Sequence, residues 1–103
     1  MATMLIAEYA HLTHDTQGHV VPLPENPPVA EQAVTFSTTA SFISSALSTA
    51  TRIVRVHCSA IGHLNFGTST ISSTTSNATK LAASTPEYFG VLPGTYIAVT
   101  QGS

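Results

Sequence analysis

The stretch TRIVRVHC, residues 51–58, carries the clearest structural signal in the chain. Apolar and polar residues alternate along it, and this two-residue period predicts a β-strand with one face against a core. Three side chains are expected to point inward (Val54, Val56 and Cys58) and three outward (Arg55, His57 and Ser59).

Short segments of the same kind lie on both sides of this strand, separated by glycine, proline or hydroxyl-rich stretches. The expected strands are residues 3–9, 18–21, 33–37, 61–66, 80–83, 87–91 and 95–100. About seven to nine short antiparallel strands at this spacing predict an all-β fold, either a small β-sandwich or a jelly-roll-like barrel.

Three segments need separate treatment. Residues 41–50 have apolar side chains at helical spacing, but their serines and threonines compete with a helix backbone, so a strand plus a loop, with at most one helical turn, is favoured over a helix. The hydroxyl-rich residues 68–79 predict a long exposed loop or an extended hairpin tip. Pro93 and Gly94 suit the centre of a type II turn, which predicts a C-terminal hairpin.

Residues 22–28 hold four of the six prolines in the chain. Proline fixes φ and removes a backbone donor, so this stretch is expected to be extended and outside any central sheet. The predicted organisation is an extended, Pro-rich N-terminal arm over residues 1–30 and a β-sandwich domain over residues 31–103.

The composition bounds the function. A chain of 103 residues makes one domain, and charged residues are only 8% against about 25% in typical soluble domains, while 16 Thr and 12 Ser take their place. Three cations (Arg52, Arg55 and Lys80) cannot neutralise a phosphate backbone, so a nucleic-acid partner is excluded. The sequence has neither a membrane-length apolar run nor a secretory signal, and a single cysteine excludes an internal disulfide.

Candidate catalytic and metal-binding groups are few. His11, His14, His19 and Asp15 could together bind a transition metal, but their spacing matches no specific site, and exposed loop histidines are expected instead. Cys58 lies between His57 and His63, yet neighbours on a strand point to opposite faces, so a buried, unreactive Cys58 is expected.

The remaining polar and aromatic groups also do not form a recognisable catalytic or binding site. The carboxylates have no spacing that forces two of them together: Glu8, Asp15, Glu25, Glu31 and Glu87. The sequon at Asn77 is attributed to chance. Four aromatic residues could line a carbohydrate groove but are expected to pack: Tyr9, Tyr88, Phe89 and Tyr96. The chain is therefore expected not to be an enzyme, with no catalytic residues, metal or cofactor.

The composition does indicate assembly. Monomers normally keep a charged surface, and a β fold has sheet edges to protect, so few charges and a Pro-rich arm favour burial in a symmetric homo-oligomer.

Three segments also resemble the small all-β virion structural proteins of tailed bacteriophages. They are TRIVRV at 51–56, NFG at 65–67, and EYFGVLPG at 87–94 leading to IAV at 97–99. The resemblance covers about residues 31–103 and implies a capsid decoration (cement) protein or a tail-associated protein, often trimeric.

The partners would be sister subunits and the major capsid protein or other virion proteins. The location would be the virion, assembled in the bacterial cytoplasm, with no membrane. The first 30 residues depart from the pattern, and on this hypothesis they would contact the shell or a sister subunit.

Two alternatives stay open. A carbohydrate- or receptor-binding β module on a tail or fibre would expose Tyr9, Tyr88 or Tyr96. A small metal-dependent enzyme of cupin-like shape would bind metal through His11, His14 or His19. Head or tail location, oligomer number, partner surface and host are not determined by the sequence.

Overall fold

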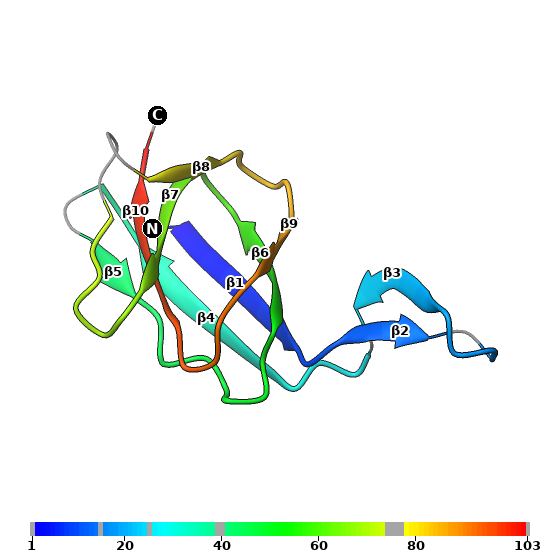
Figure 1. Cartoon of the computed structure of the whole chain (residues 1–103). Coiled ribbons are helices and arrows are strands. Elements are labelled where there is room, and N and C mark those ends of the chain that lie inside the picture. Colours follow the sequence, from blue (N-terminus) through cyan, green and yellow to red (C-terminus); the bar gives the residue numbers. More distant parts are fainter. Residues whose placement is uncertain (1, 15, 25, 39–40, 74–77, 103) are drawn as a thin grey trace.

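The computed structural model describes residues 2–14, 16–24, 26–38, 41–73 and 78–102, and these residues form ten strands and no helix (Figure 1). The first sheet has the order β4-β1-β6-β9: Ala30–Phe36, Ala2–Tyr9, Ile53–Cys58 and Glu87–Gly90. The second has the order β5-β10-β7-β8: Phe42–Ile43, Tyr96–Gln101, Gly62–Gly67 and Thr79–Leu81. A separate hairpin joins β2 (Leu12–His14) to β3 (Val20–Pro24).

The two four-stranded sheets form a small antiparallel β-sandwich, which confirms the predicted fold class. Its interior consists of apolar side chains from alternate positions of each sheet. In β6 the alternation is as predicted, because Val54, Val56 and Cys58 are completely buried. From the second sheet, Leu64, Ile97 and Val99 are equally buried.

The N-terminal boundary differs from the prediction. β1 lies in the centre of the first sheet, between β4 and β6, with Met4 and Ile6 in the core. An arm over residues 1–30 is therefore wrong for residues 2–9, because this strand pairs on both sides and its residues 2–8 alternate between buried and more exposed side chains. The part that projects from the sandwich is the β2–β3 hairpin, seen at the right of Figure 1, and the whole chain measures 49 × 26 × 21 Å.

The projecting hairpin is an insertion in a longer one. β1 and β4 pair antiparallel with Glu8 opposite Ala30, and the Val29 amide donates to the Glu8 carbonyl at 2.6 Å. The chain leaves the sheet after Tyr9 and returns at Val29, so residues 10–29 form the arm proper. We call residues 10–29 the arm from here on.

The predicted C-terminal hairpin is wrong, although its turn is present. The Thr95 amide donates to the Leu92 carbonyl at 3.3 Å, and Gly94 has φ +72°, as a type II turn requires. However, β9 pairs with β6 in the first sheet, whereas β10 pairs with β7 and β5 in the second. The turn reverses the chain while carrying it from one sheet to the other.

Residues 41–50 form the short strand β5 followed by a loop, which confirms the preference for a strand plus a loop. The loop follows the edge of β10, where the Ser44 and Leu47 amides donate to the Ile97 and Thr95 carbonyls at 2.9 Å each. Within the described part of the chain, no helix has the length and hydropathy needed to cross a bilayer.

Candidate interaction site

The histidines of the arm do not form a described metal site. His11 and His19 are exposed at its base and near its tip, whereas Asp15 and the side chain of His14 lie outside the described part. Among the described residues, no three His, Cys, Asp or Glu side chains cluster as metal ligands would.

The strand geometry separates the thiol from its neighbouring histidine. Cys58 points into the core, where burial raises the pKa of its thiol from 9.0 to about 11. His57 points to the opposite face of the first sheet. His63 lies on β7 in the other sheet and is itself buried, with its Nδ1 atom lacking a hydrogen-bond partner among the described residues.

Glu8, one of the five carboxylates in the sequence, is buried, with only 2% of its surface exposed. Its Oε1 accepts hydrogen bonds from the Ser48 backbone amide and the Thr51 hydroxyl, both at 2.8 Å, and its Oε2 accepts one from the Gln32 side-chain Nε2 at 3.4 Å. These donors satisfy the carboxylate without a cation. Glu8 therefore ties β1 to the loop that enters β6, which is a structural role.

The four aromatic residues considered for a carbohydrate groove are separated in the fold. Tyr9 is buried, and Tyr96 is half-buried on the second sheet. The Phe89 ring packs in the interior on Phe66, with ring centroids 5.1 Å apart. Tyr88 is 53% exposed and points outward from the first sheet.

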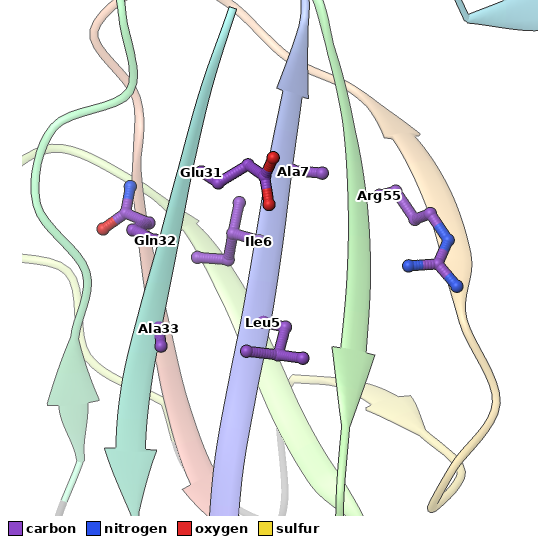
Figure 2. Close-up of a pocket in the computed structure, with 7 residues that line it drawn as sticks. All are labelled: Leu5, Ile6, Ala7, Glu31, Gln32, Ala33 and Arg55. Atoms are coloured by element: carbon purple, nitrogen blue, oxygen red, sulfur yellow. The ribbon is translucent and has the colours of Figure 1, made fainter. Parts of the chain in front are cut away.

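The outward side of the first sheet is an accessible surface of the sandwich. We call it the open face; from β1, β4, β6 and β9 it presents Thr3, Leu5, Ala7, Glu31, Ala33, Thr35, Arg55, His57 and Tyr88. A shallow depression of about 360 Å³ lies on it, around Leu5 and Ala7 (Figure 2). Leu5, in the middle of the face, is 49% exposed.

The strand register places charges symmetrically on the open face. Ala7 pairs with Glu31 on one side and with Arg55 on the other, and Arg55 in turn pairs with Tyr88. One row across the sheet thus contains an acid, a methyl group, a base and an aromatic ring. Neither Glu31 nor Arg55 has an ion-pair partner among the residues that the structure describes.

The outward side of the second sheet is covered by the chain itself. The outward residues of β7 each meet part of residues 71–73: Ile71 lies over Gly67, the Asn65 side chain donates to the Ser72 carbonyl at 3.2 Å, and the Ser73 hydroxyl donates to the His63 carbonyl. The Ser73 amide also donates to the Ser41 hydroxyl at 2.9 Å. Residues 68–70 are exposed, as predicted for this loop, whereas residues 71–73 form a cover in which Ser73 is buried; residues 74–77, including the Asn77 sequon, lie outside the described residues.

The arm is the second accessible surface. Leu23 is 61% exposed and Val29 44% exposed, and Gly18 (φ +83°) stands in the turn between β2 and β3. The sequence of residues 10–29 contains no Lys or Arg.

No protein-family model matches this chain, and the comparisons with curated proteins and with solved structures found no match.

Proposed function

We propose that this protein is a non-enzymatic structural protein of a tailed-phage virion, a capsid decoration (cement) protein that docks across capsid subunits through its arm. The observation that carries the proposal is the form of the arm, a narrow two-stranded ribbon inserted into the β1–β4 hairpin. The resemblance of residues 51–56, 65–67 and 87–99 to virion proteins supplies the phage context.

A two-stranded ribbon alone is marginally stable in water, because it has no second layer on which to bury its apolar side chains. β2 and β3 have three and five residues, and their register is irregular between Leu12 and His14. Leu23 and Val29 remain exposed on the arm. Docking on another protein would bury these side chains and order the ribbon, so a binding role accounts for its shape.

The low charge of the chain supports docking between proteins. Burying an ion at an interface costs desolvation energy unless it is paired. Only Asp15 and Glu25 carry charge in the arm, apart from any protonated histidine. An arm of this kind can enter a groove between capsid subunits at little electrostatic cost.

The direct test is the protein content of particles from the phage whose genome carries this reading frame. Mass spectrometry of purified virions, separated into heads and tails, is expected to find the chain in the head fraction in many copies. Its presence in the lysate of infected cells but absence from virions would overturn the proposal. Recovery from tails alone would instead favour a tail-associated protein.

The role of the arm is tested by its removal. Deletion of residues 1–28 is unsuitable, because it removes the central strand β1. Replacement of residues 10–28 by Asn-Gly would instead join Tyr9 to Val29 by a two-residue hairpin turn. The shortened protein is expected to fold but to lose binding to heads stripped of the chain. Binding equal to that of the full chain would contradict docking through the arm.

A second candidate function is carbohydrate or receptor binding by a tail or fibre module, and exposed Tyr88 next to Arg55 favours it. A sugar ring can stack on such a tyrosine. Binding on a glycan array that is lost in Tyr88→Ala, together with recovery from tails, would replace the decoration proposal.

A further inference from the structure

The open face has a charge pattern that fits a second copy of itself. Glu31 and Arg55 lie on opposite sides of Ala7 in one row of the sheet, each one strand away from β1. Adjacent strands are about 4.8 Å apart, so the two Cα atoms are separated by about 10 Å. Figure 2 shows the two side chains on the strands that flank β1, with no contact between them.

We infer that two copies of this chain pair through their open faces about a two-fold axis parallel to β1. Rotation about such an axis exchanges the two flanks of β1 and keeps each residue of β1 at its own level. Glu31 of one copy then lies opposite Arg55 of the other, and the symmetry repeats the ion pair. This inference goes beyond the proposed function and does not depend on it.

The neighbouring rows fit the same operation. In the next row, Ala33 and His57 flank Leu5, so each imidazole meets a methyl group while the two Leu5 side chains meet on the axis. In the row after that, Thr35 and Ser59 flank Thr3, since the Ser59 amide donates to the Thr3 carbonyl and the Thr3 amide to the Ser59 hydroxyl. Hydroxyl groups then meet hydroxyl groups. In these three rows, no two like charges face each other. Away from the axis, no two large apolar side chains face each other either.

The charges favour this occupant over an unrelated partner. The chain has only three Lys or Arg residues, and one of them, Arg55, stands on this face with Glu31 at the mirror position. Each is left without an ion-pair partner within the described chain, and pairing of the faces would give both of them one. Small residues at Ala7 and Ala33 let the two sheets approach to the usual separation of about 10 Å.

Charge reversal tests the pairing, with molar mass measured by light scattering after size-exclusion chromatography. The wild-type chain is expected to be a dimer. Arg55→Glu and Glu31→Arg each place like charges opposite one another twice, and each is expected to raise the dissociation constant of the dimer roughly 100-fold. Lys80→Glu makes the same charge change on the second sheet and is expected to leave the dimer intact.

Mixing the two charge-reversed chains is the most specific test of the pairing. The Arg55→Glu chain carries two acids on its open face and the Glu31→Arg chain two bases, so the mixture is expected to form a heterodimer that neither chain forms alone. Three results would overturn the inference: a wild-type chain that is monomeric at a concentration of about 100 μM, a wild-type trimer, or a dimer whose dissociation constant does not change on charge reversal. A trimer needs contact between two different surfaces and would leave arm docking untouched.

A cross-link provides a readout that needs no charge change. Leu5→Cys places two thiols together on the proposed axis, and mild oxidation is expected to give a disulfide-linked dimer. The natural Cys58 is buried, with its thiol pKa raised to about 11, so it does not compete. Thr38→Cys, an exposed position beyond the end of β4, serves as the control and is expected to remain unlinked. Equal cross-linking of both variants would contradict the geometry.

Discussion

The two sheets of the sandwich differ in what lies on their outward sides. The second sheet is closed by residues 71–73, which contact Gly67, Asn65 and His63 in turn along β7. The first sheet has no such cover among the described residues, and Leu5 stands half-exposed at its centre. The hydroxyl-rich segment thus covers one face and leaves the other accessible, which is why we assign pairing with a second copy of the chain to the first sheet.

The difference between the two sheets also shows how the polar groups of a chain with few charged residues find hydrogen-bond partners. On the covered side, hydrogen bonds from side chains to backbone replace the charged groups that a surface sheet usually carries. On the open side, one acid and one base stand apart in the same row. The following experiments test this contrast, beginning with the substitution that we expect to destabilise the protein most.

Phe36→Ala tests whether stability resides in the shared interior rather than on either outer face. Phe36 is fully buried, and its ring reaches the second sheet, 3.7 Å from the position that a Cβ would take at Gly62. The free energy of unfolding in urea is expected to fall by about 3–5 kcal/mol. Thr35→Ala, its exposed neighbour on the open face, is the control and is expected to change it by less than about 0.5 kcal/mol. Similar losses in both variants would show that the open face is part of the folding core.

Glu8→Ala tests the tie at one end of the first sheet. It leaves the Ser48 amide and the buried Thr51 hydroxyl without their acceptor, so a loss of about 2 kcal/mol is expected in the same measurement. Glu8→Gln keeps one acceptor oxygen and should lose less. The exposed Glu87→Ala is the matched control. If the midpoint of urea unfolding did not change in Glu8→Ala, water would have replaced the carboxylate as the hydrogen-bond acceptor.

The Cys58 thiol reports on the interior through pH. Its pKa is about 11 in the folded protein and 9.0 when unperturbed, so the unfolded chain releases this proton first as the pH rises. Stability attributable to this group is therefore complete below pH 9 and is lost between pH 9 and about 11, by about 3 kcal/mol. Urea unfolding at several pH values is expected to show a steeper decline for the wild type than for Cys58→Ala. Parallel declines would indicate that the thiol does not stay protonated in the fold.

Ser73→Ala tests the cover of the second sheet with the smallest change. It removes the hydroxyl donor to the His63 carbonyl, so a loss of about 1 kcal/mol is expected, with faster hydrogen exchange of the amides in residues 71–73. Ser72→Ala is the matched control, because Ser72 contributes only its backbone carbonyl to the cover. If both serines behaved alike, the cover would not depend on the side-chain bond.

The parts of the fold that follow from alternation could be predicted from the sequence. The inward positions of residues 51–58 and the buried Cys58 were correct because a strand's side chains point to opposite faces whatever its partners are. The type II turn before residue 95 was also correct, since proline and glycine decide a turn locally. The C-terminal hairpin was wrong, because a turn determines the reversal of the chain and not which strands pair on either side of it.

The candidate surfaces required the tertiary structure for the same reason. The sequence predicts a strand over residues 3–9, but only the register places Glu31 and Arg55 on either side of Ala7. Likewise, the hydroxyl-rich residues 71–73 carry no periodic signal, and their place on β7 depends on bonds to residues as distant as Ser41. The all-β class, the low charge and the inward faces can be predicted from the sequence, because they depend on local geometry and composition. The pairing of the strands, the covered face and the point where the arm leaves the sheet require the folded structure, because they depend on contacts between residues far apart in the chain.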